Sequence, residues 1–177
     1  ENAGAISSGT SALIMECTSA GQTVGLGGGS GQWQMSGTEM QTITATGMTV
    51  GGAQCGSQIV NGVSATHSNG VSSILTLLAS KDGRTVTFSG TESVFNALAV
   101  QSNKGVEISV DVTTDTGAMH LDGDSDTTSD SLDTVGITYG RTLTAATVMT
   151  LQSATSGIVP AGTLTLAAKT GVYITDN

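Results

Sequence analysis

Residues 105–112 read Gly-Val-Glu-Ile-Ser-Val-Asp-Val, with an aliphatic side chain at every second position after the glycine. Successive side chains of a β-strand point to opposite faces of the sheet, so this alternation predicts a strand with one buried face. The same period of two recurs in short runs along the whole chain, and Gly, Asn, Asp or Ser separates nearly all of these runs. No longer stretch carries the apolar stripe of an amphipathic helix. The sequence therefore predicts an all-β protein.

The predicted strands are distributed over the entire chain, and the last of them run close to its end. They are Leu13–Cys17, Thr23–Leu26, Trp33–Met35, Met48–Val50, Ile59–Val63, Ile74–Leu78, Val86–Phe88, Ala97–Val100, Val106–Val112, Met119–Leu121, Val135–Tyr139, Thr142–Thr144, Val148–Leu151, Leu164–Ala167 and Val172–Thr175. Because strand-like residues occur near both ends, we expect unpaired strand edges there.

A short internal repeat indicates stacked units. Ser36-Gly37-Thr38-Glu39 recurs as Ser89-Gly90-Thr91-Glu92, and each copy follows a predicted strand. The repeated regions extend over residues 33–52 and 86–110, and a looser copy covers residues 142–175. We expect the same turn to be used in both copies of the motif.

Two architectures accommodate strands of this kind. The first is a right-handed parallel β-helix, or β-solenoid, formed by residues 1–177 as a single segment. The alternative is an antiparallel β-sandwich. Aromatic residues make up only 3% of the chain, which suits the narrow interior of a solenoid. Dipeptides that form tight two-residue hairpin turns are also few, so we favour the β-helix.

Composition and charge exclude several classes of function. The formal net charge is −9, with 5 Lys and Arg against 14 Asp and Glu, so nucleic acid is not an expected partner. The apolar runs are far shorter than the roughly 20 residues that a membrane-spanning helix needs, so membrane insertion is not expected. The chain opens at Glu1 without methionine, and we expect a processed or excised segment.

Two cysteines are present, Cys17 and Cys55, and neither lies in a CxxC motif. Their spacing to each other and to the histidines does not fit a zinc site. Two interpretations remain open: a disulfide formed in an oxidising compartment, or two buried thiols that act as small apolar residues.

Gly105–Gly117 and Gly162–Ile174 resemble the coil sequence of filamentous-haemagglutinin-type repeats. Such units recur in giant repetitive cell-surface proteins. The resemblance implies a right-handed parallel β-helix that serves as an extracellular surface fibre or adhesin stalk. The family has no catalytic residues to transfer to this chain.

The most distinctive local feature is an aspartate-rich insertion at residues 122–133. Its carboxylates fall at positions 1, 3, 5, 9 and 12 of a twelve-residue window, as in an EF-hand loop: Asp122, Asp124, Asp126, Asp130 and Asp133. Position 6 is Thr127 instead of glycine, and no helices flank the window. The insertion is therefore either a calcium site or a solvated corner loop, and we favour the corner loop.

Other chemistry-bearing residues have plainer interpretations. His120 lies between Met119 and Leu121, so the alternation directs it outward. Glu39 and Glu92 occupy equivalent places in the two motif copies, which explains them better than a glycosidase pair does. Trp33 beside Met35 is expected to fill a cap or corner. No catalytic residue is predicted.

Taken with the resemblance, these features predict a non-enzymatic structural module of an extracellular fibre, adhesin or surface appendage. It would act by coil stacking and self-association, with neighbouring copies or adjacent repeats of a longer chain as partners. The alternative is a carbohydrate-binding or polysaccharide-processing β-helix that recognises surface glycans. No cofactor other than calcium is expected.

Overall fold

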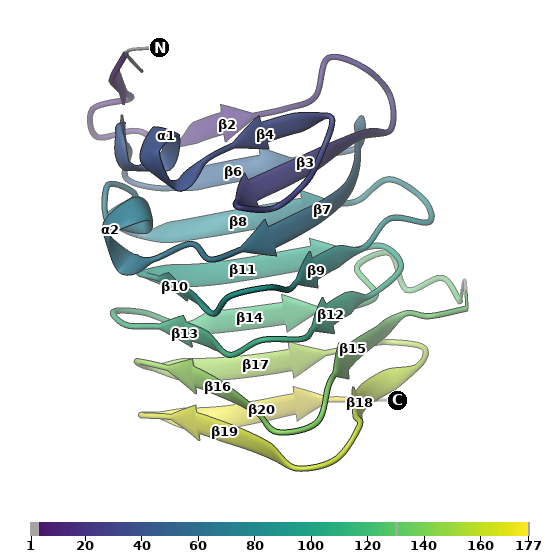
Figure 1. Ribbon diagram of the computed structural model, residues 1–177. Coiled ribbons are helices and arrows are strands. Elements are labelled where there is room, and N and C mark those ends of the chain that lie inside the picture. The colour runs from purple at the N-terminus through teal and green to yellow at the C-terminus, as the bar shows by residue number, and fades with distance from the viewer. Residues whose placement is uncertain (1–3, 130, 177) are drawn as a thin grey trace.

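Parallel β-sheets dominate the computed structural model, which describes residues 4–129 and 131–176 (Figure 1). Sheet 1 contains, in spatial order, β2 (Leu13–Met15), β6 (Met48–Gly51), β8 (Ile74–Ala79), β11 (Ala97–Ser102), β14 (Met119–Asp122), β17 (Val148–Gln152) and β20 (Gly171–Thr175). Sheet 2 contains β4 (Trp33–Met35), β3 (Gln22–Gly27), β7 (Cys55–Asn61), β9 (Val86–Phe88), β12 (Val106–Ile108), β15 (Thr134–Ile137) and β18 (Gly157–Pro160). Sheet 3 contains β10 (Ser93–Phe95), β13 (Val112–Thr114), β16 (Arg141–Ala145) and β19 (Leu164–Ala168), and a separate pair joins β1 (Ile6–Ser7) to β5 (Ile43–Thr44).

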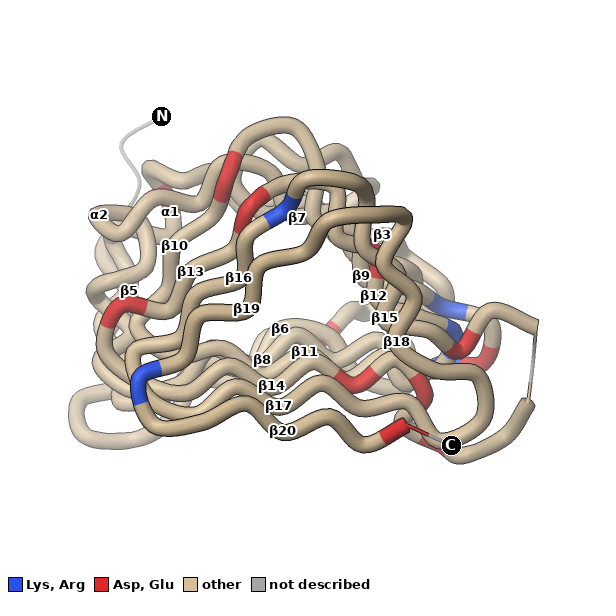
Figure 2. The backbone as a smooth tube through the Cα atoms, turned by 90° about the horizontal axis from the view of Figure 1, so that it is seen from below, with Lys and Arg blue, Asp and Glu red and all other residues tan. Residues whose placement is uncertain are grey.

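All strand pairs among the described residues are parallel, so the antiparallel β-sandwich considered from the sequence is wrong. From β9 onward the chain visits sheets 2, 3 and 1 in turn, and each strand pairs with the one three elements later. We call one such passage a circuit. Seen along the stack, the three sheets form the sides of a three-cornered outline (Figure 2).

The register places like residues above one another in columns that run through successive circuits. One inward column of sheet 1 consists of Leu13, Met48, Leu75, Leu98, Met119, Met149 and Val172. A second consists of Met15, Val50, Leu77, Val100, Leu121, Leu151 and Ile174. In the middle circuits these side chains are fully or almost fully buried. Aliphatic side chains therefore build a continuous core, and its two phenylalanines, Phe88 and Phe95, meet edge to face at 6.5 Å.

Two short helices depart from the expectation that only strands occur. α1 (Gly37–Gln41) and α2 (Ala65–Ser68) lie against each other on the side of the stack that sheet 3 occupies in later circuits, and α2 contacts β10. Gly37 approaches the His67 ring so closely that a Cβ there would collide with it. Close stacking of the two helices thus requires glycine at this position.

The glycine run at residues 25–31 also has a steric cause. After β3 the chain forms a loop and then β4, which pairs parallel with β3 at the edge of sheet 2. A Cβ on Gly25 or Gly29 would collide with neighbouring backbone, so the loop can pack this closely against β3 and β7 only with glycine at these positions. Gln32 fixes the loop, since its amide and its side chain exchange hydrogen bonds with Thr23.

Candidate functional site

The C-terminal end of the stack exposes side chains that belong to the core register. Val172 and Ile174 of β20 pair with Met149 and Leu151, which are fully buried, yet they are 39% and 55% exposed. Leu166 of β19 likewise lies over a fully buried residue and is itself only half-buried. Figure 2 views the molecule from this end, with β18, β19 and β20 nearest to the reader. An inward-facing column therefore reaches the surface here.

The strand edges at this end are not equivalent. In β18, Pro160 has no amide hydrogen, and the Ile158 N–H donates to a carboxylate oxygen of Asp176 at 3.4 Å. Both features reduce the capacity of β18 to accept another strand. The edges of β19 and β20 are the better template for further pairing.

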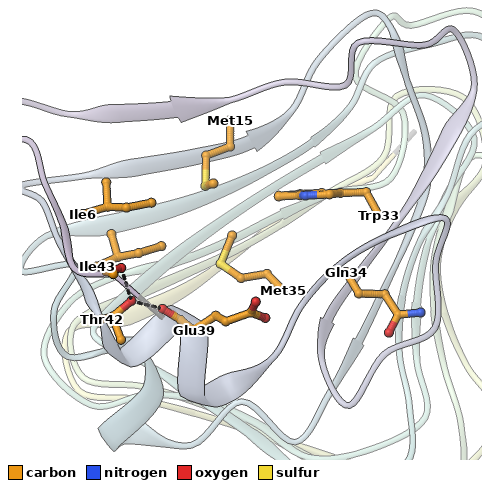
Figure 3. A pocket seen from close by; sticks show the side chains of 9 residues that line it. Ile6, Met15, Trp33, Gln34, Met35, Glu39, Thr42 and Ile43 are labelled. Carbon is orange, nitrogen blue, oxygen red and sulfur yellow. Dashed lines mark hydrogen bonds between the residues drawn. The ribbon is translucent and has the colours of Figure 1, made fainter. Parts of the chain in front are cut away.

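The N-terminal end carries an apolar pocket of about 250 Å³ (Figure 3). Its walls come from β1, β2, β4, α1 and β5. Trp33 and Met35 follow the inward register of Val24 and Leu26 in sheet 2, and Met15 continues an inward column of sheet 1. The pocket is thus the N-terminal end of the same apolar core, and the chain that precedes β2 partly covers it.

Trp33 bears on the glycan-binding alternative. The indole packs against the core rather than standing free on a lateral face, and Figure 3 shows it across from Met15. Gln34 is exposed, and its side-chain amide donates to the backbone oxygen of Gly31 at 2.9 Å. The residues around the indole are mainly apolar, whereas a sugar site needs polar groups that converge on the ligand.

The two cysteines form a disulfide with an S–S distance of 2.05 Å. Cys17 follows β2 in sheet 1, and Cys55 begins β7 in sheet 2. The bond therefore joins the first strands of the chain to the third strand of a neighbouring sheet.

The aspartate-rich insertion lies at the corner where the chain leaves sheet 1 for sheet 2. The structure describes four of the five predicted aspartates. Asp126 accepts a hydrogen bond from the Asn103 side chain at 2.7 Å, and Asp133 accepts one from Thr155 at 3.2 Å. Asp122 and Asp124 are almost completely buried. Asp130 lies outside the described residues.

These aspartates do not assemble the predicted EF-hand arrangement among the residues that the structure describes, because no group of three or more acidic, histidine or cysteine side chains is placed to hold a metal ion. Thr127, which replaces the glycine of such a loop, nevertheless adopts a φ of 59°. Burial raises the pKa of Asp122, and the neighbouring charge of Asp124 adds to this shift. The Asp124 N–H and His120 act in the opposite direction.

The histidines and glutamates have local roles. His120 faces outward between two fully buried neighbours, as the alternation predicted. His67 accepts a hydrogen bond from the Ser64 N–H at the start of α2. Glu39 accepts hydrogen bonds from the amide and the hydroxyl of Ser36, and these bonds lower its pKa. The carboxylate closes a capping box on α1.

The motif that contains Glu92 behaves differently, since it forms a bend before β10. The two copies of the motif therefore do not use the same turn, although each follows a strand of sheet 2.

Several polar residues that position the backbone were not identified from the sequence. Gln58 is fully buried and occupies an inward position of sheet 2. Asn61 links two turns, because its side chain donates to Gly28 O at 3.3 Å and accepts from Thr91 N at 2.9 Å. A polar residue at an inward position of an alternating strand is the signal that would have revealed Gln58.

No family model, curated protein or solved structure matches this chain. Among the described residues, no helix has the length and apolarity that spanning a bilayer would require.

Proposed function

We propose that this chain is a stretch of right-handed parallel β-solenoid that serves as a non-enzymatic structural module of an extracellular fibre, adhesin or surface appendage. It acts by stacking, either on another copy or on adjacent repeats of a longer chain. The observation that carries the proposal is the exposure of core-register side chains at the C-terminal end, led by Val172 and Ile174. Parallel connections between strands of one sheet are right-handed in about 98% of cases, which supports the handedness.

The physical basis is that each circuit covers the apolar face of the previous one. In repeat proteins, terminal capping units with a polar outer face normally cover the apolar side chains of the last repeat. A last circuit without such a cap exposes its aliphatic side chains to water. The last circuit here has Leu166, Val172 and Ile174 instead of polar residues at these positions. Burial of such side chains yields about 25 cal/mol for each Å² removed from water, so covering this end favours association.

The extracellular location is supported by the disulfide, since such bonds persist mainly in oxidising compartments. Few charged residues and a single proline fit a regular, stiff repeat.

The proposal is tested with concentrated protein by electron microscopy and by fibre diffraction. We expect rods with an axial repeat of about 4.8 Å, the spacing of neighbouring strands. Val172→Glu places a charge on the proposed contact and should abolish the rods. Ile74→Glu is the matched control, because Ile74 is 38% exposed but lies in β8 in the middle of sheet 1.

Rods that persist in Val172→Glu, or that disappear equally in Ile74→Glu, would contradict stacking through the C-terminal end. Discrete monomers of the unmodified chain at all concentrations would contradict self-association.

A further inference from the structure

A group of buried polar side chains lies at the corner between sheets 1 and 2, in contrast to the aliphatic core. Its members share a relative exposure of 5% or less and come from three successive circuits. They are Ser102, Asn103, Asp122, Asp124, Asp133 and Ser153. Figure 2 shows Asp and Glu at this corner, near β15 and β18, together with Lys and Arg.

Most of these groups have hydrogen-bond partners. Ser102 donates its hydroxyl to Arg84 O at 2.8 Å, and Asn103 accepts from the Gly83 N–H at 2.6 Å. Ser153 accepts from the Gly157 N–H at 2.7 Å. The Asn103 side chain also donates to Asp126, and the Ser125 N–H donates to Ser102 O, so hydrogen bonds connect successive circuits at this corner.

Asp124 is the exception. Its side chain is 0% exposed, and neither carboxylate oxygen has a hydrogen-bond partner. Only its backbone amide is engaged, since the Asp124 N–H donates to an Asp122 carboxylate oxygen at 3.0 Å. An isolated carboxylate in such a place is costly, because burial removes its hydration without replacement.

A second carboxylate increases this cost. Asp122 is 5% exposed, and its charge and that of Asp124 repel each other. The donors of this corner are bonded to other acceptors, so a hard divalent cation is the kind of group that would neutralise the two adjacent carboxylates. Calcium takes oxygen ligands from carboxylates, backbone carbonyls and water, in a flexible geometry.

We propose that this corner binds calcium, with Asp124 as the central carboxylate ligand and Asp122 as the second. The remaining ligands would be backbone oxygens and water, because the described residues do not provide a group of three acidic side chains for one ion. With two carboxylates the affinity falls in the weak class of extracellular modules, where Kd is about 0.1 to 1 mM. The bound ion joins the end of β14 to the loop that follows it.

The test uses the whole chain and calcium chloride as the probe. Thermal unfolding is followed in EDTA and at calcium concentrations up to about 10 mM, well above the expected Kd. The ionic strength is matched with sodium chloride, so that screening of the net charge of −9 does not contribute. We expect Tm to rise with calcium and titration calorimetry to give a Kd near the millimolar range.

Asp124→Asn removes one negative charge and keeps the size of the side chain. It should unfold at a higher temperature than the unmodified chain in EDTA and should lose the calcium-dependent rise in Tm. Asp126→Asn is the matched control, since that carboxylate is more exposed and already bonded to Asn103. It should retain the calcium response.

An unmodified chain without a calcium-dependent Tm or calorimetric signal overturns the proposal. So does an Asp124→Asn variant that keeps the full response. An Asp124→Asn variant that is less stable in EDTA also overturns it, because that result would show that the carboxylate stabilises the chain without calcium. Each of these outcomes is independent of rod formation, which tests the stacking function separately.

Discussion

At the scale of single residues, buried polar side chains take over backbone hydrogen bonding where strands end. Gln58 lies between Val24 and Val86 in an inward column of sheet 2. Its amide nitrogen donates to Val50 O at 3.1 Å and to Leu78 O at 3.0 Å, across the interior in sheet 1. A glutamine in the core thereby donates to carbonyls of two neighbouring strands of sheet 1, β6 and β8.

We therefore predict that Gln58→Leu destabilises the chain although it makes the column more apolar. Removing the donor takes one hydrogen bond from Val50 O and one from Leu78 O, although Leu78 O keeps the bond from the Gly52 N–H. The substitution also removes Oε1, a buried acceptor without a partner, so the expected loss is about 1 kcal/mol of unfolding free energy. Urea unfolding measures the difference. Gln101→Leu, a half-buried glutamine at the end of β11, is the control and should change stability by less than about 0.5 kcal/mol. Equal effects of the two substitutions would show that the hydrogen bonds of Gln58 are not important for stability.

At the scale of elements, alternation predicts strands well and corners poorly. Residues 106–112 alternate without interruption, yet they form β12 and β13 with a corner between them. Val110 in that corner is also buried, so the period of two continues through the bend. β1, β10 and β18 were not predicted from the sequence, and each has only two to four residues.

The repeated Ser-Gly-Thr-Glu motif shows why local sequence does not suffice. Its first copy caps α1, whereas in the second copy Thr91 N is held by Asn61 and the following residues pair with β13. The same four residues adopt two structures because their tertiary partners differ. The calcium prediction shows the same limitation: the loop was identified, but the burial that distinguishes Asp124 from Asp126 depends on neighbouring circuits.

The disulfide gives a prediction about the first strands. A bond that closes a separation of 38 residues restricts the unfolded chain, and the chain-entropy estimate is about 4 kcal/mol. We expect a reducing agent to lower the urea midpoint by a corresponding amount. The Cys17→Ala/Cys55→Ala variant should be less stable and insensitive to the reducing agent. A midpoint that does not change on reduction would mean that β2 is held by packing alone.

At the scale of the whole molecule, the composition indicated stacked β-strands, but it did not indicate which side chains are exposed at the two ends of the stack. A low aromatic content and short alternating runs are properties of every circuit, so they were visible without the structure. The difference between the two ends depends on which residues fall last in each column. The N-terminal mouth is narrowed by Trp33 and Met15, whereas the C-terminal end leaves Val172 and Ile174 exposed.

This asymmetry and the charge of the chain lead to a prediction about salt. Each copy carries a formal net charge of −9, so copies that stack end to end repel each other while their aliphatic ends attract. The screening length falls from about 30 Å at 0.01 M to about 10 Å at 0.1 M ionic strength, which weakens the repulsion but not the apolar contact. Association measured by sedimentation velocity should therefore strengthen over this range, and Val172→Glu should remain monomeric at both concentrations. Complexes that dissociate as salt is added would instead indicate ion pairs between the copies and would place the contact on a charged lateral face.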